Sequence, residues 1–162
     1  MLQTKVKPDL RDIAQEAYTF TLPLVAMESF RRRRMSLGPM NEMFHARKLL
    51  HFKSRHITAP NNDTLYTSAV LELSKTPVRL TLPDSGDRYL SVALMDMFTD
   101  QTMVGHADNG GKGGTYLIVG PDSAQKDGPG VIRMPSNDVW LLARTFVAGV
   151  DDPDAARAGQ SG

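Results

Sequence analysis

The chain has 162 residues, of which 41% are apolar and 23% charged, the proportions of one ordinary globular domain. It contains no cysteine, which excludes disulfides, thiolate metal sites, iron–sulfur clusters and a cysteine nucleophile. The net charge of +1 conceals an asymmetry, because residues 1–56 hold 11 Lys and Arg against 5 Asp and Glu, whereas residues 57–162 hold 8 against 13.

The first predicted element is a helix that begins near Asp9, which can cap it. Apolar residues then recur at helical spacing along one face, and the stripe continues toward Phe30. Pro23 lies inside this pattern and lacks the backbone donor that a helix interior needs, so we expect a kink or a restart there. Gly38-Pro39 ends the helical region, and Asn41–Leu50 is read as a second, shorter helix.

The basic run Arg31–Arg34 falls near the end of the first helix. It has one functional interpretation, the binding of a nucleic acid or an anionic surface. It also has two structural ones: a solvated helix end where the dipole favours cations, or docking on the acidic second part of the chain. We favour the structural interpretations, because a lone basic run often occurs without nucleic-acid binding. We therefore expect neither a nucleic acid nor a membrane as partner.

From Ile57 onward, short apolar runs alternate with Pro, Gly, Asn and Asp clusters at a spacing typical of antiparallel β-strands. The expected strands begin at Leu65, Val78, Tyr89, Tyr116, Val131 and Val139. Residues 83–87 are read as a hairpin turn, and the glycine-rich segment 108–114 as a flexible hairpin connection rather than a phosphate loop. The predicted fold is α+β, a helical segment (1–56) followed by a mainly antiparallel β-sandwich or jelly-roll-like body (57–150).

The remaining residues, 151–162, begin like a helix at Asp152-Pro153 but offer less than two turns, so we interpret them as the start of a truncated helix or tail. No stretch approaches the ~20 apolar residues of a membrane span. The apolar run Leu22–Met27 is followed, rather than preceded, by arginines, unlike a secretory signal. We expect a soluble, cytoplasmic protein.

Polar residues cluster most densely in the segment 60–66, Pro-Asn-Asn-Asp-Thr-Leu-Tyr. Such residues form local hydrogen bonds that shape a turn before a strand, which is the structural interpretation. The amides of Asn61 and Asn62, the Asp63 carboxylate and the Tyr66 phenol also have the chemistry to line a polar pocket, and both interpretations stay open.

Two strands carry a charged residue at an apolar position. Asp96 shares the strand face of Leu94, and Arg144 shares that of Leu142, so a buried Asp96–Arg144 ion pair is expected as a structural feature. The alternative is that Asp96 acts on a ligand. Among the four histidines, His106 is the candidate acid or base, because it follows the Asp96 strand, and no histidine spacing indicates a metal site.

Several motifs together resemble the bacterial family called domain of unknown function 1254, from about Ala17 to Asp154. They are Met40-Asn41 with His45-Ala46-Arg47, Pro60 through Tyr66, Arg88-Tyr89, Met95-Asp96, the glycine-rich segment before Tyr116 through Pro121, and Val139-Trp140 with Arg144-Thr145. The resemblance implies a β-rich protein in which a second domain of unknown function, 1214, follows, and which is often exported. This sequence departs from that pattern, because it shows neither an export signal nor the second domain.

Two functional hypotheses follow. The first is a metal-independent, hydrolase-like enzyme for a small molecule, or a fragment of one. It would use Asp63, Tyr66, Asp96 and His106 as catalytic residues, Asn61, Asn62 and Arg144 as ligand-binding residues, and no cofactor. The second is a non-catalytic module for ligand binding or assembly, which needs a second copy, a second domain or a partner chain. The enzyme hypothesis requires the polar residues to converge on one hollow, and it fails if they point to different regions.

Overall fold

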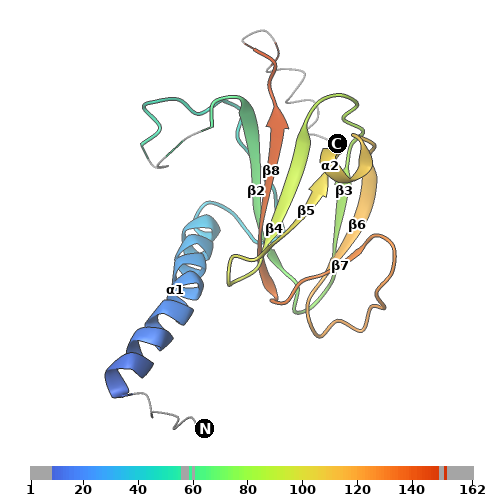
Figure 1. The fold of residues 1–162 in the computed structure, drawn as a ribbon. Coiled ribbons are helices and arrows are strands. Elements are labelled where there is room, and N and C mark those ends of the chain that lie inside the picture. Colours follow the sequence, from blue (N-terminus) through green and yellow to red (C-terminus); the bar gives the residue numbers. More distant parts are fainter. Residues whose placement is uncertain (1–8, 56–58, 60, 150–151, 153–162) are drawn as a thin grey trace, which may run out of the picture.

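The computed structural model describes residues 9–55, 59, 61–149 and 152, and in them one long helix precedes two β-sheets (Figure 1). This is the predicted α+β arrangement. The elements are α1 (Leu10–Met35), β1 (Phe44–His45), β2 (Thr64–Glu72), β3 (Val78–Leu82), β4 (Leu90–Met95), β5 (Gln101–Gly105), α2 (His106–Asn109), β6 (Gly114–Val119), β7 (Val131–Arg133) and β8 (Asp138–Phe146).

Sheet A has the strand order β1-β2-β8-β4-β5, and sheet B has the order β3-β6-β7. The β6–β7 pair is parallel and the other pairs are antiparallel. The longest pairing joins β2 to β8, from Thr64 opposite Phe146 to Glu72 opposite Asp138. Strand β8 is therefore the central strand of sheet A, paired with β2 on one side and with β4 on the other.

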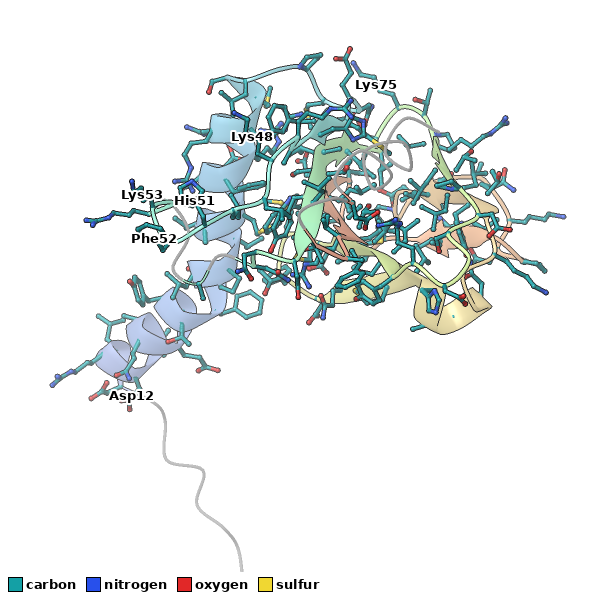
Figure 2. All side chains as sticks on the ribbon, turned by 90° about the horizontal axis from the view of Figure 1, so that it is seen from above. Asp12, Lys48, His51, Phe52, Lys53 and Lys75 are labelled. Atoms are coloured by element: carbon teal, nitrogen blue, oxygen red, sulfur yellow. The ribbon has the colours of Figure 1, made fainter. Side chains whose placement is uncertain are left out.

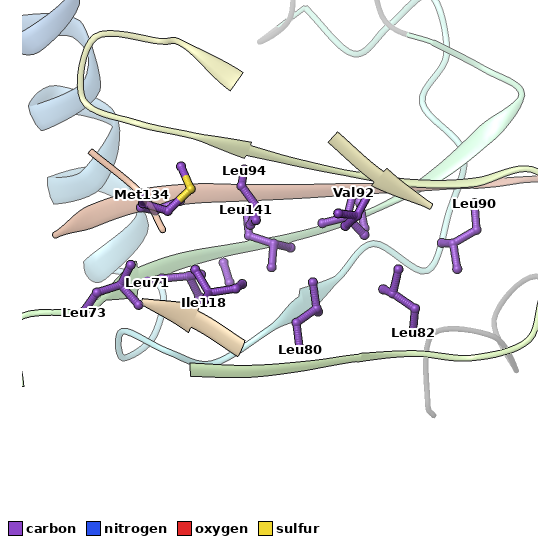
Figure 3. Packing of buried hydrophobic residues seen from close by; sticks show 14 residues of the cluster. Leu71, Leu73, Leu80, Leu82, Leu90, Val92, Leu94, Ile118, Met134 and Leu141 are labelled. Atoms are coloured by element: carbon purple, nitrogen blue, oxygen red, sulfur yellow. The ribbon is translucent and has the colours of Figure 1, made fainter. Parts of the chain in front are cut away.

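The hydrophobic core lies between the two sheets (Figure 3). Its buried side chains come from strands of both, including Leu71, Leu80, Leu94, Ile118 and Leu141. Along β2 every inward position (65, 67, 69 and 71) is buried as predicted, although Thr64 and Val70 on the outer face are buried too. Strand β3 shows the predicted alternation. The predicted inward faces of these two strands are confirmed.

Helix α1 begins as predicted, with the Asp9 carboxylate accepting a hydrogen bond from the Asp12 N–H at 2.8 Å. It then runs past Pro23 as one helix, so the restart expected at this residue does not occur. The apolar contacts that follow, at Met27 and Phe30, hold the second half of the helix on sheet A and offset the lost backbone hydrogen bond.

The C-terminal half of α1 docks on the outer face of sheet A, the face that points away from sheet B. The Phe30 ring lies 4.3 Å from the Trp140 ring, centroid to centroid, and the Arg31 Nε donates to Asp138 Oδ1 at 3.0 Å. Arg34 is buried and donates from Nη2 to the Glu42 carbonyl. The Arg31–Asp138 contact supports the interpretation that the basic run docks on the acidic part of the chain, whereas Arg34 is held by the segment just before β1.

The second helix predicted over Asn41–Leu50 is wrong. Its backbone bonds to strand β2 instead: the Asn41 N–H donates to the Val70 carbonyl and the Ala46 N–H to the Tyr66 carbonyl. The Asn41 side chain bonds both the N–H and the carbonyl of Glu72. Because these bonds take the groups that a helix would need internally, the segment becomes a turn and the edge strand β1.

The two expected hairpins are also wrong. Residues 83–87 join β3 in sheet B to β4 in sheet A, and residues 108–114 lead from α2, beside sheet A, to β6 in sheet B. Both segments therefore carry the chain across the core. Turn-forming composition marks where a strand ends, but it does not specify which strand the next one pairs with.

Strand β5 and the single helical turn α2 were not anticipated from the sequence. The helix predicted after Asp152 lies outside the described residues, except for Asp152 itself. Within the described part of the chain, no helix combines the length and the apolar character needed to cross a membrane.

Candidate functional site

The Asn-Asn-Asp corner builds the start of β2. Asn61 Oδ1 accepts a hydrogen bond from the Asp63 N–H at 2.8 Å, and the Asp63 carbonyl accepts one from the Val147 N–H at 2.8 Å. The side chains of Asn62 and Asp63 are exposed. Asn61 thus forms the local turn that its residue type favours, while the Asp63 backbone fixes the corner to the end of β8.

Tyr66 and Arg144 are neighbours on the outer face of sheet A. They stand opposite each other in the β2–β8 register, and the Arg144 guanidinium carbon lies 6.0 Å from the centroid of the Tyr66 ring. This geometry is that of a cation–π contact. Ser91 and Gly105 continue the same row across β4 and β5, and His106 follows directly. Five of the predicted residues, Asn61, Asn62, Asp63, Tyr66 and Arg144, therefore lie toward one end of β2 and β8, and His106 lies at the same end of the sheet.

Asp96 lies at the other end of sheet A. Arg144 pairs with Ser91, whereas Met95 pairs with Trp140, so Asp96 is five residues farther along β4, about 17 Å at the rise of an antiparallel strand. The expected Asp96–Arg144 ion pair is therefore wrong. The strand pattern revealed that each residue shares a face with apolar neighbours, but not the register that separates them.

The Asp96 carboxylate has a local partner set instead. It is only 4% exposed, and its Oδ1 accepts hydrogen bonds from the N–H groups of Phe98 at 2.8 Å and Asp100 at 3.0 Å. The turn that it closes places Thr99 at a φ of 71°, a conformation that needs such support. Asp96 thus accepts from two backbone donors of the turn between β4 and β5.

His106 lies beneath the glycine-rich segment. Its Nδ1 is buried and has no hydrogen-bond partner among the described residues. A side chain added at Gly111 would have its Cβ 3.0 Å from this nitrogen and 2.0 Å from the Gly86 carbonyl oxygen, so only glycine fits there. The segment 108–114 is therefore packed against both His106 and the turn after β3.

Sequence reasoning missed a second polar pair, His45 and Thr67. His45 Nδ1 lies 2.8 Å from Thr67 Oγ1, and both residues line a cavity of about 40 Å³ that opens between the two sheets. Burial, with a smaller contribution from the Arg47 cation, lowers the pKa of His45 below its usual value. A signal was present, since the inward face of β2 predicts a buried hydroxyl at Thr67 that needs a partner. Because residues 41–50 were expected to form a helix, His45 was not recognised as the partner of Thr67.

The remaining walls of the cavity are mostly apolar, from Leu80 and Leu82 in sheet B to Leu90 and Leu141 in sheet A. Its volume accommodates a few water molecules rather than an organic substrate. Among the described residues, no group of three His, Asp or Glu side chains is arranged to hold a metal ion.

A comparison with family models matches residues 40–162 to the family described as "Protein of unknown function (DUF1254)". The chain belongs to the DUF1254 family. The matched region of this DUF1254 chain includes both sheets and leaves out helix α1. The expected resemblance is thereby confirmed.

Among solved structures, the DUF1254 chain is similar to the crystal structure of the VPA0106 protein from Vibrio parahaemolyticus, with a TM-score of 0.76 and 24% sequence identity. At this identity the likeness shows the fold alone. The alignment covers 93% of this chain but 36% of the Vibrio chain, so the DUF1254 chain spans about a third of the length of that protein. No curated protein matches it.

Proposed function

We propose that this chain is a non-catalytic assembly module, whose helix α1 packs against a second polypeptide surface, and that a second copy of the chain occupies this surface when the chain is expressed alone. The observation that carries the proposal is the apolar character of α1 on the side that faces away from the sheets.

The middle of α1, Ala17–Met27, contains no charged residue. A helix that is apolar on all sides is normally buried on all sides. Tyr18, Leu22 and Val25 nevertheless have exposed fractions of 67%, 49% and 61%. We call these three residues the outer row, because their i, i+4, i+7 spacing places them on one side of the helix.

The outer row lies opposite the docked side of α1. Tyr18 and Met27 are nine residues apart, which is half a turn out of phase at 100° per residue, and Met27 is buried against the body. Figure 1 shows the N-terminal half of α1 extending beyond the sheets. Contiguous apolar surface of this kind marks an interface more often than a free surface.

The length of the similar Vibrio protein supports the same proposal. More than half of that chain has no counterpart here, although its matched part has the same fold. Additional polypeptide is thus compatible with this fold, and α1 offers it an apolar surface that the two sheets leave uncovered.

The test is the oligomeric state of the isolated chain as a function of concentration, by light scattering after size-exclusion chromatography. We expect a concentration-dependent dimer for the wild type and a monomer for the double variant Leu22→Glu/Val25→Glu. The matched control is Thr76→Glu/Gln125→Glu, which adds the same charge at two exposed polar positions outside the helix and should leave the dimer intact. A wild type that stays monomeric at every concentration would contradict the proposal.

A second candidate, small-molecule binding, is supported by the stacked Tyr66 and Arg144 at the open end of sheet A. Asp63 lies toward the same end and would supply the acid–base group of a hydrolase-like site, with Asn61 and Asn62 beside it. His106 follows β5, three strand spacings or about 14 Å from Tyr66 across the sheet, so it does not reach the same ligand atoms. Asp96 is too far away to take part. A metabolite library screened by thermal shift tests this candidate, since a ligand of this site stabilises the wild type but not Arg144→Ala.

A further inference from the structure

The segment between Glu42 and Asp63 has an unusual charge pattern. These 20 residues, 43–62, contain four Lys and Arg and no acidic residue. The described part of this segment after β1, residues 46–55, is called the basic loop below. It includes Lys48, Lys53 and Arg55, and it lies apart from the Arg31–Arg34 run considered above.

The basic loop presents a phenylalanine at its tip. Phe52 has an exposed fraction of 85%, among the highest of the large apolar side chains. The turn around it is held by local hydrogen bonds: the Ser54 N–H donates to the His51 carbonyl at 2.7 Å, and the Lys53 N–H donates to His51 Nδ1 at 3.2 Å. The exposed position of Phe52 is thus a property of an ordered turn.

One cation lies over this aromatic ring, and two more belong to the same loop. The Lys53 ammonium lies 5.6 Å from the centroid of the Phe52 ring. Lys48, Lys53 and Arg55 are exposed, and none of them forms an ion pair with a carboxylate in the described part of the chain. Figure 2 shows His51, Phe52 and Lys53 together at the end of the loop farthest from the sheets.

We infer that the basic loop binds the surface of an anionic phospholipid membrane, with Phe52 entering the interface and the cations of the loop contacting lipid headgroups. An aromatic side chain flanked by Lys and Arg suits this boundary, because its ring gains from the apolar region while the cations remain among phosphates. A single-stranded nucleic acid would instead favour several aromatic platforms spaced along a groove, whereas the two rings of the described loop, His51 and Phe52, are adjacent at its tip. Binding of this kind needs no membrane-spanning helix.

The experiment is co-sedimentation of the full chain with vesicles of phosphatidylglycerol and phosphatidylcholine, against vesicles of phosphatidylcholine alone. We expect binding to the anionic vesicles only, weakening as the salt concentration rises. Lys48→Glu/Lys53→Glu should lower the partition coefficient by at least about 25-fold, at roughly fivefold for each lost cation. Phe52→Ala should lower it by roughly tenfold.

The matched control is Lys112→Glu/Lys126→Glu, which reverses two exposed lysines far along the chain and should retain binding. Equal loss in this control would overturn the inference, because attraction would then follow net charge alone. Full binding by Phe52→Ala would overturn it as well, and so would wild-type binding to single-stranded DNA that displaces the vesicles. Loss of binding in Leu22→Glu/Val25→Glu instead of the loop variants would assign the contact to α1 and reject the loop.

Discussion

The two-sheet body and helix α1 are stabilised in different ways. The body buries a continuous cluster of side chains from both of its sheets, whereas only Met27 and Arg34 are buried among the 26 residues of α1. The body therefore forms its own hydrophobic core, whereas the stability of the helix comes mainly from the surface that it packs against. One chain thus combines a body that packs on itself with a helix most of whose side chains remain exposed.

The largest effect is expected from a core truncation in the body. Leu141→Ala removes a side chain that is buried in β8 between the sheets, and should lower the free energy of unfolding by about 2–5 kcal/mol. Leu22→Ala in the outer row of α1 should change it by about 0.5 kcal/mol or less. Urea denaturation gives the free energy of unfolding of each variant. Equal losses in the two variants would contradict the different stabilisation of body and helix.

The turn at Asp96 lies where the body meets the free half of α1, since the Phe20 and Phe98 rings are 5.2 Å apart between centroids. Asp96→Ala leaves two backbone donors without their acceptor, and should cost about 2 kcal/mol. Asp96→Asn keeps one side-chain oxygen and should cost less. If denaturation instead shows no loss of stability in either variant, the structural role of this carboxylate is refuted.

Detachment of α1 can be observed directly, because Trp140 is the sole tryptophan and stacks on Phe30. Phe30→Ala should lower the unfolding free energy by about 1 kcal/mol and shift the Trp140 emission to longer wavelength as water reaches the ring. Tyr18→Ala, on the opposite side of the helix, is the control and should leave the emission unchanged. An unshifted spectrum in Phe30→Ala would show that the helix stays docked without this contact.

The smallest effect concerns acid stability. Hydrogen bonds from Arg88 and the Ala148 N–H, together with the Arg88 charge, lower the pKa of Asp152 to about 2. Because this folded-state pKa lies below the ordinary value of 3.8, the stabilisation is present above pH 4 and is lost as the pH falls from about 4 to 2. Asp152→Asn should flatten this part of the stability–pH curve, and an unchanged slope would exclude the Arg88–Asp152 pair as its cause.

Local features of the fold could be predicted from the sequence, because they depend on neighbouring residues. The Asp9 cap and the inward faces of β2 and β3 are examples. Strand pairing could not be predicted, since β2 pairs with β8 across more than 60 residues and alternation carries no information on register. The same reason explains why Asp96 and Arg144 were expected to meet.

The candidate site shows the same limit. The turn at Asn61 follows from residue chemistry, as does the need for a partner at Thr67. The partner of Thr67 is His45, and it is brought there only because Asn41 bonds the edge of β2 and prevents a helix. A polar pair formed by distant residues needs the topology before it can be recognised.

The position of β8 within sheet A also dictates the order in which the body can assemble during synthesis. Strands β2 and β4 leave the ribosome well before β8, yet each bonds to it and not to the other. Until residues 138–146 emerge, these two apolar strands have open edges that other nascent chains can pair with. We therefore expect the body to fold late, after β8 emerges, and more slowly than a domain of local contacts, because the long loop between β2 and β8 must close first.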